Sequence, residues 1–316
     1  MQDGGNQYEV FDVVGIYARF GLSIAEAGRL RKRGGMSIYG KIKKIKGWNK
    51  ALDAVRKEAE KPVSIAIIGN PQVEVEITAL LQVDAAKKAV FGASEHKREA
   101  DREARLRGAD LAIAVVEKGE SKSRLKAVAE QARMSQARLV VVNGSDYDEA
   151  FVAELKEVFR IAVGGMLFVS AVDAETIETA IIPPVVKKLA KKEVSLAVKL
   201  PAFRDEVVKS IIADTARQNA LIGVAVFVPG ADMPLMMLNQ VRMVMKMAAA
   251  YDEELSVKRL NEILAVIGGG LALRIAARQL LGFVPVAGWA IKGGIAYGGT
   301  YAMGEAAKKY FDSKPA

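Results

Sequence analysis

Residues 63–78 read VSIAIIGNPQVEVEIT, and the fold follows from this stretch. The run at 63–68 is apolar apart from Ser64 and stops at Gly69, which is typical of a strand buried on both faces of a parallel sheet. Residues 72–78 then alternate between apolar and polar positions with a period of two, which is the pattern of a strand. Their place directly after a strand and a turn favours a helix instead, so both structures stay open for this segment.

Three further apolar runs follow at 111–116, 138–142 and 166–169. Helical patterns lie between them, at about 121–134 and 148–158. Strand, helix and strand at this spacing indicate parallel strands joined by right-handed crossovers. We therefore predict an α/β fold with a parallel sheet and helices on both of its faces.

The segments on either side have a different character. Residues 1–61 hold an apolar stretch, a basic block and a charged helix at about 48–59, which presents Leu52 and Val55 on one face. Residues 176–316 contain no convincing strand pattern and have the character of long helices broken at prolines. The sequence thus predicts three parts, an N-terminal segment (1–61), an α/β domain (62–175) and an all-α domain (176–316).

The turn after the first strand stands where nucleotide-binding proteins wrap their backbone around phosphates. Such a loop needs a glycine for N–H contacts, a lysine for the terminal phosphates and a Ser or Thr for magnesium. Counted from Gly69, these three positions hold Glu74, Val75 and Glu76. A carboxylate about 4 Å from a phosphate charge is repelled by roughly 4 kcal/mol at an effective dielectric of about 20. The two glutamates therefore oppose nucleotide binding, unless they point away or fill the anion site themselves.

Two downstream fragments stand at the places of guanine-binding motifs. Asn143-Gly144-Ser145-Asp146 follows the third run, where guanine-binding proteins carry Asn-Lys-x-Asp, but an Asn-Gly turn leaving a strand explains the same residues without a ligand. Ser170-Ala171 follows the last run and matches a further guanine contact. No Asp-x-x-Gly occurs between Gly69 and Asp110, so the magnesium-side switch is missing. The candidate nucleotide-site residues are Gly69, Asn143, Asp146 and Ser170.

Taken together, these features resemble a bacterial family of Era-like GTPase proteins with a helical C-terminal domain of unknown function (family 697). The likeness covers about residues 48–316, and its segments are 50–62 (KALDAVRKEAEKP), 200–204 (LPAFR), 218–220 (QNA), 228–234 (VPGADMP), 239–243 (NQVRM) and 297–307 (YGGTYAMGEAA). The resemblance implies a degenerate P-loop GTPase-like sheet followed by a membrane-associated helical domain. This chain departs from the active members in the phosphate loop, the magnesium switch and the guanine-site lysine.

Composition excludes several kinds of site. The chain has Cys 0 and His 1, which excludes disulfides, cysteine nucleophiles and metal sites built from thiolates or several histidines. His96 stands in a charged stretch that is typical of a solvated surface. We therefore predict no catalytic residue, no metal site and no cofactor. The alternative to the last prediction is that the chain binds GTP.

The net charge of +9 is concentrated near the N-terminus. Between Gly28 and Lys50 the chain has nine Lys and Arg residues and no Asp or Glu. Such a block is attracted to lipid headgroups or to a nucleic-acid backbone, although a solvated linker explains it equally well. Tyr39 and Trp48 could stack on bases, but no recognised nucleic-acid motif accompanies them, so nucleic acid is the less favoured partner.

Residues 263–304 hold two apolar helical stretches that form a candidate hairpin. Ile263–Leu281 has the length of a membrane span but contains Arg274 and Arg278, each unfavourable by ~2.5–3.5 kcal/mol at a bilayer centre. The second stretch, 283–304, contains a single lysine. Small residues repeat every four positions at Gly294, Gly298, Ala302 and Ala306, which predicts a close helix contact. The candidate interface anchors are Trp289, Tyr297 and Tyr301. The hairpin spans a membrane, lies on it or packs in a soluble bundle; the sequence leaves all three open.

The leading functional hypothesis is a non-catalytic pseudo-GTPase scaffold on a membrane-associating helical domain. The N-terminus lacks the pattern of a signal peptide, which favours a cytoplasmic protein at the cytoplasmic face of the membrane. The expected partners are a membrane surface and a protein of unknown identity, and assembly with further copies of the chain is left open. The alternative is a divergent GTP-binding protein with weak GTPase activity, which would contact guanine through Asn143 and Asp146.

Overall fold

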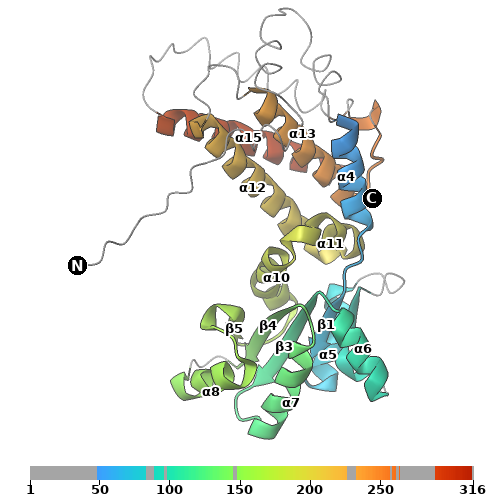
Figure 1. Ribbon diagram of the computed structural model, residues 1–316, viewed down its shortest axis with the longest axis vertical. Helices are drawn as coiled ribbons and strands as arrows, with labels where there is room; N and C mark the ends of the chain where they lie inside the picture. Colours follow the sequence, from blue (N-terminus) through green and yellow to red (C-terminus); the bar gives the residue numbers. More distant parts are fainter. Residues whose placement is uncertain are drawn as a thin grey trace, which may run out of the picture. The chain divides into compact units, whose positions relative to one another are not determined.

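The computed structural model describes residues 48–82, 89–95, 98–144, 148–225, 233–256, 258–260, 263 and 289–314 (Figure 1). The chain forms two compact units. The first, called here the α/β unit, comprises Lys57–Ser210 and Ala250–Asp252. The second, called the helical unit, comprises the described residues within Met1–Arg56, Ile211–Ala249 and Glu253–Ala316.

The α/β unit contains a five-stranded sheet in the order β2-β1-β3-β4-β5. All neighbouring strands are parallel; Ile65 of β1, for example, pairs with Val90 of β2 and with Leu111 of β3. The strands are β1 (Ile65–Ile68), β2 (Val90–Gly92), β3 (Leu111–Glu117), β4 (Ala137–Asn143) and β5 (Met166–Val169). The predicted α/β class, the parallel sheet and four of its strands are confirmed. The fifth, β2, was not predicted, because its three residues form no apolar run of recognisable length.

Helices cover both faces of the sheet, as the sequence predicted. The four helices are α5 (Pro71–Leu81), α6 (Glu99–Gly108), α7 (Lys122–Arg133) and α8 (Glu149–Phe159). One buried cluster joins Ala66 and Ile68 of β1 with side chains of α6, α7 and α8, among them Leu106, Leu125 and Phe159. Residues alternate across a strand, so the intervening strand residues face the other side, where α5 packs on β1 and β2.

Residues 71–81, which include the segment left open between strand and helix, form the helix α5. The side chain of Asn70 accepts a hydrogen bond from the N–H of Gln72, and Pro71 stands at the first helical position, where its missing N–H has no partner to lose. The buried residues Glu74, Ile77 and Leu81 are spaced as one face of a helix requires. Capping and tertiary packing therefore override the period-two pattern.

Every element that the structure describes after β5 is helical. These elements are α9 (Ala174–Thr176), α10 (Ile182–Lys188), α11 (Glu193–Lys199), α12 (Arg204–Ala225), α13 (Met233–Ala250) and α15 (Trp289–Asp312), with a π-helical turn at Ile177–Ile181 and 3₁₀ turns at Ala190–Lys192 and Pro201–Phe203. The π turn precedes Pro183 and Pro184, which lack the N–H groups that an α-helix needs at those positions. The α/β unit extends through α11 to Ser210, whereas the predicted division fell at 175/176.

The helical unit includes most of α4 (Trp48–Glu60), the expected lead-in helix, which buries Leu52 and Val55 on one face as predicted. Its helices α12 and α15 approach closely. A Cβ on Gly304 would lie 2.7 Å from the side chain of Ile212, and one on Gly293 would lie 2.8 Å from that of Val224. The earlier residue of α15, Gly293, faces the later residue of α12, Val224, and Gly304 faces Ile212, so the two helices run antiparallel.

The close contact uses other glycines than the sequence predicted. A Cβ on Gly294 or Gly298 would meet nothing within 4 Å, and Ala302 is exposed. Residues 264–288, which include the start of the second arm of the predicted hairpin and all of its first arm except Ile263, lie outside the described residues. Within the described ranges, no helix is both long enough and apolar enough to cross a membrane.

Candidate functional site

Three of the four predicted site residues lie at the carboxyl edge of the sheet. Gly69 directly follows β1, Asn143 is the last residue of β4, and Ser170 directly follows β5. Because all strands are parallel, these ends share one edge, although β3 separates β1 from β4. Ser170 is exposed. Asp146 lies outside the described residues.

Gly69 is required by a close approach of two backbones. A Cβ at this position would lie 2.9 Å from the carbonyl oxygen of Val115 in the neighbouring strand, which no other residue can accommodate without a shift of the strand. The N–H of Gly69 donates to Oε1 of Glu74 at 3.0 Å. Its carbonyl oxygen accepts a hydrogen bond from Nη2 of Arg124 at 3.1 Å.

The Glu74 carboxylate fills the space beside this turn. The residue is 3% exposed and shares the inward face of α5 with Ile77 and Leu81. Its Oε2 accepts hydrogen bonds from the backbone N–H of Ser94 at 2.8 Å and from Oγ of the same residue at 2.5 Å. Both carboxylate oxygens are thus hydrogen-bonded, one to the turn after β1 and one to the 3₁₀ turn Ala93–Glu95 that follows β2.

Gly92 makes room for this carboxylate. A Cβ on Gly92 would lie 2.9 Å from Oε2 of Glu74, closer than real Cβ contacts. The N–H of Gly92 donates to Oε1 of Glu95 at 2.9 Å. Sequence reasoning missed Gly92 and Ser94, because β2 itself gave no signal.

The other two positions of the absent phosphate loop point outward. Val75 is 66% exposed. Oε1 of Glu76 accepts a hydrogen bond from Nε2 of Gln72, one turn earlier on the exposed side of α5, at 3.2 Å. The sequence predicted that two glutamates, Glu74 and Glu76, oppose nucleotide binding. Only Glu74 faces the turn after β1, and its carboxylate occupies the position beside that turn.

A second group of charged side chains lies beside Gly69: Glu120 is in the loop after β3, and Arg124 is in the first turn of α7. Arg124 Nε lies 3.7 Å from Oε1 of Glu120. Burial raises the pKa of Glu120; the Arg124 charge opposes this shift and the Glu117 charge adds to it. The other oxygen, Oε2, is buried and has no hydrogen-bond partner among the described residues. Neither Glu120 nor Arg124 carried a sequence signal.

Asn143 and Gly144 form a turn that leaves β4. Asn143 Nδ2 donates to Oε1 of Glu117 at 3.2 Å. Gly144 has a φ of +112°, which side chains rarely adopt, and its N–H donates to the carbonyl oxygen of Val169 at 2.9 Å. A lysine in place of Gly144 would therefore strain this turn.

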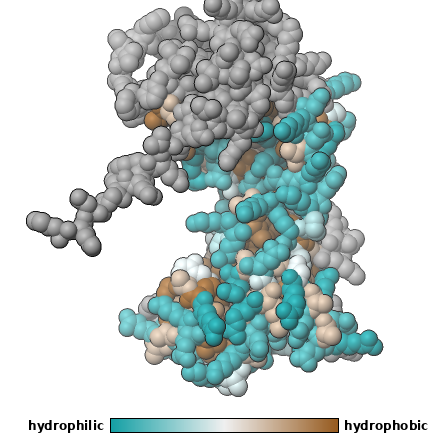
Figure 2. Space-filling model, viewed as in Figure 1, coloured by the Kyte–Doolittle hydropathy of each residue, from teal (hydrophilic) through white to brown (hydrophobic). Residues whose placement is uncertain are grey.

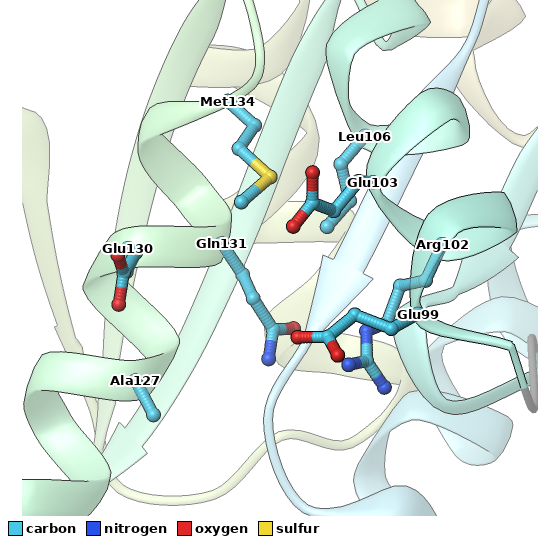
Figure 3. Close-up of a pocket in the computed structure, with 8 residues that line it drawn as sticks. All are labelled: Glu99, Arg102, Glu103, Leu106, Ala127, Glu130, Gln131 and Met134. Carbon is cyan, nitrogen blue, oxygen red and sulfur yellow. The ribbon is translucent and has the colours of Figure 1, made fainter.

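A pocket of ≈ 250 Å³ lies elsewhere, between α6 and α7 (Figure 3). Glu99, Arg102, Glu103 and Leu106 line it from α6, Ala127, Glu130 and Gln131 line it from α7, and Met134 lines it from the C-cap of α7. Figure 3 shows the Gln131 amide and the Glu99 carboxylate pointing toward one another across the gap. No predicted site residue lines this pocket.

Within the described ranges, no group of three or more His, Cys, Asp or Glu residues is placed to hold a metal ion. Compared with protein-family models and with curated proteins, the chain matches none. The resemblance to Era-like GTPase proteins therefore stays a prediction.

Proposed function

We propose that this protein is a non-catalytic scaffold, in which a degenerate GTPase-like α/β unit that does not depend on nucleotide is joined to a membrane-associating helical unit. In this proposal the α/β unit keeps the parallel sheet of a nucleotide-binding domain but offers its surface to a protein partner. The helical unit brings that surface to the cytoplasmic face of a membrane.

The observation that carries the proposal is the buried Glu74 carboxylate. It accepts hydrogen bonds from Gly69 N–H and Ser94 N–H, at 3.0 and 2.8 Å. A phosphate entering this turn would have to displace the carboxylate, and it would meet a negative charge at close range. A nucleotide is therefore opposed both by the lack of free donors and by charge.

The positions that would hold the rest of a nucleotide support the same conclusion. Val75 and Glu76 stand in place of the lysine and the magnesium-binding hydroxyl, and both are exposed. Asn143 already donates its side-chain N–H to Glu117, and the backbone of Gly144 disfavours the guanine-site lysine.

Membrane association is supported by features of the helical unit. Ile295 is 70% exposed, Leu221 49% and Tyr301 41%, and the rings of Tyr297 and Tyr301 stack with their centroids 5.9 Å apart. Tyrosine is favoured at membrane–water interfaces. Hydrophilic side chains predominate on the face of the α/β unit visible in Figure 2. The basic block 28–50 adds attraction to anionic lipid.

Titration of the full chain with fluorescent GTP in magnesium buffer tests the scaffold. We expect no saturable binding at micromolar concentrations. Micromolar binding that is lost in Asp146→Ala would overturn the proposal and favour a divergent GTP-binding protein. If the wild type also hydrolysed GTP and Asp146→Ala did not, the protein would be a GTPase.

Co-sedimentation with lipid vesicles tests the membrane part. We expect the chain to sediment with vesicles that contain phosphatidylserine and to sediment less when Lys43, Lys44 and Lys46 are replaced by Gln. An equal loss with neutral vesicles would contradict a role for the charge. Binding to RNA with a steep salt dependence, and none to anionic vesicles, would show that the basic block serves nucleic acid instead.

A further inference from the structure

We infer that Glu74 is the permanent internal ligand of an oxyanion site, and that its carboxylate joins the turn after β1 to the turn after β2 as a bound oxyanion would. The inference rests on the proposed function, since it explains how the α/β unit keeps its shape without a nucleotide. When the Glu74 side chain is removed, the site should accept a small oxyanion, such as formate or inorganic phosphate.

The donors come from two separate loops. Gly69 N–H belongs to the turn after β1, and Ser94 N–H and Oγ belong to the turn after β2. Two backbone N–H groups and a hydroxyl converging on a carboxylate are the donor set that proteins use for anions without a cation. Within the described ranges, no Lys or Arg forms an ion pair with Glu74, so these dipoles provide the compensation for its charge.

The carboxylate occupies space that the surrounding backbone leaves for it. Oε2 lies 2.9 Å from where a Cβ of Gly92 would stand, and Glu74 as a whole is 3% exposed. Truncation of Glu74 therefore leaves a gap on the inward face of α5, and the three donors, which are part-buried, lose their acceptor. An anion of suitable size would restore their hydrogen bonds.

Apart from these hydrogen bonds, the turn after β2 is held to the turn after β1 through the pairing of β2, a short edge strand, with β1. β2 comprises three residues and pairs only with β1. Its first N–H is satisfied locally, since Val90 N–H donates to Oε1 of Gln82 at 2.8 Å. Beyond its carboxyl end, the Ser94–Glu74 hydrogen bonds tie the chain back to α5. Loss of the Glu74 carboxylate should therefore loosen β2 and the turn Ala93–Glu95 first.

Chemical rescue tests the inference. In chloride, Glu74→Ala is expected to lower the thermal midpoint of the full chain, because three donors lose their acceptor. Formate or phosphate at the same ionic strength should raise the midpoint of this variant by about 3–6 °C at tenfold excess over the dissociation constant. The wild type and Glu74→Gln, in which the site remains filled, should show no such anion-specific rise.

Two variants serve as controls. Glu76→Ala removes an exposed carboxylate from the same helix and should respond to the anions as the wild type does. Ser94→Ala, combined with Glu74→Ala, removes one donor and should reduce the rescue. Where Glu74→Ala does not fold in chloride, the refolding yield in formate relative to chloride becomes the measurement, with at least a threefold increase expected.

The inference is overturned if Glu74→Ala responds to formate and phosphate no more than the wild type does, or if refolding yields are equal. Rescue by formate alone would narrow the ligand class to planar carboxylates and overturn the assignment of phosphate. Nucleotide binding by the wild type would remove the proposed function while leaving these rescue measurements unaffected, so the two failures are distinguishable.

Discussion

Asn219 on α12 donates a hydrogen bond from Nδ2 to Oγ1 of Thr300 on α15, at 2.9 Å. Both side chains are buried, with exposed fractions of 0% and 1%. Asn239 Nδ2 in turn donates to Oδ1 of Asn219 at 2.9 Å, and Gln240 Nε2 donates to the Thr300 hydroxyl at 3.1 Å. The polar groups thus satisfy one another across α12, α13 and α15, which favours one relative register of these helices.

Thr300→Val is expected to destabilise the helical unit by about 1–3 kcal/mol. The change preserves the shape of the side chain but removes the oxygen that Asn219 and Gln240 share, leaving buried amide hydrogens with fewer acceptors. Hydrogen exchange of the α15 amides measures this loss. Tyr301→Phe, which removes an exposed hydroxyl one residue along, is the control; equal protection in the two variants would contradict a structural role for the network.

Replacement by alanine should change the free energy of unfolding in opposite directions at two glycines of α15. Gly304→Ala places a methyl group against Ile212, which is fully buried and branched, so we expect a loss of about 1–3 kcal/mol. Gly298→Ala meets open space and should stabilise the helix by roughly 0.5–1 kcal/mol. The midpoints of urea unfolding measure both, and a loss in Gly298→Ala would indicate that the open face is covered.

The ion pair of Asp110 and Lys192 holds α11 to the start of the sheet. Lys192 Nζ lies 2.6 Å from Asp110 Oδ1 and donates to the carbonyl oxygen of Pro62 at 2.8 Å. Lys192→Met leaves a carboxylate that is 7% exposed without its cation, at an expected loss of about 2–4 kcal/mol. Hydrogen exchange of β1 and β3 measures the effect.

A double-mutant cycle provides the control for this pair. Because Asp110→Asn removes the charge that Lys192 neutralises, the double variant with Lys192→Met should lose less stability than the sum of the two single variants. Additive losses would mean that the two groups do not interact energetically.

Glu120 should make the stability of the α/β unit depend on pH. Burial is the main cause that raises its pKa above 4.5, so protonated Glu120 stabilises the native state, and this contribution is lost as the pH rises through the folded pKa. Glu120→Gln resembles the protonated form. Its stability relative to the wild type should therefore increase between about pH 4.5 and neutral pH.

Urea unfolding of the wild type and Glu120→Gln at a series of pH values measures this difference. Glu157→Gln, which changes an exposed carboxylate on α8, serves as the control. A difference between Glu120→Gln and the wild type that does not change with pH would contradict the argument.

The apolar runs of β1, β3, β4 and β5 could be recognised in the sequence because a strand buried on both faces must be continuously apolar. The same reasoning missed β2, whose three residues are held by pairing with β1 rather than by a pattern of their own. It could not resolve 72–78 either, because Glu74 is polar and yet lies on the buried face of its helix. Only the partners of its carboxylate explain that position.

By itself, the sequence determined that Gly69 ends a strand, that the lysine and hydroxyl of a phosphate loop are absent, and that the chain has no cysteine. These are properties of single residues and of their order. Tertiary structure alone decided that Glu74 turns inward and Glu76 outward. The inward position of Glu74 depends on Gly92 at the end of β2, which leaves space for the carboxylate, and on Ser94 in the turn after β2, which donates hydrogen bonds to it. A carboxylate beside the end of a strand can repel an anionic ligand or take its place. Which of the two happens depends on whether the fold brings hydrogen-bond donors to that carboxylate.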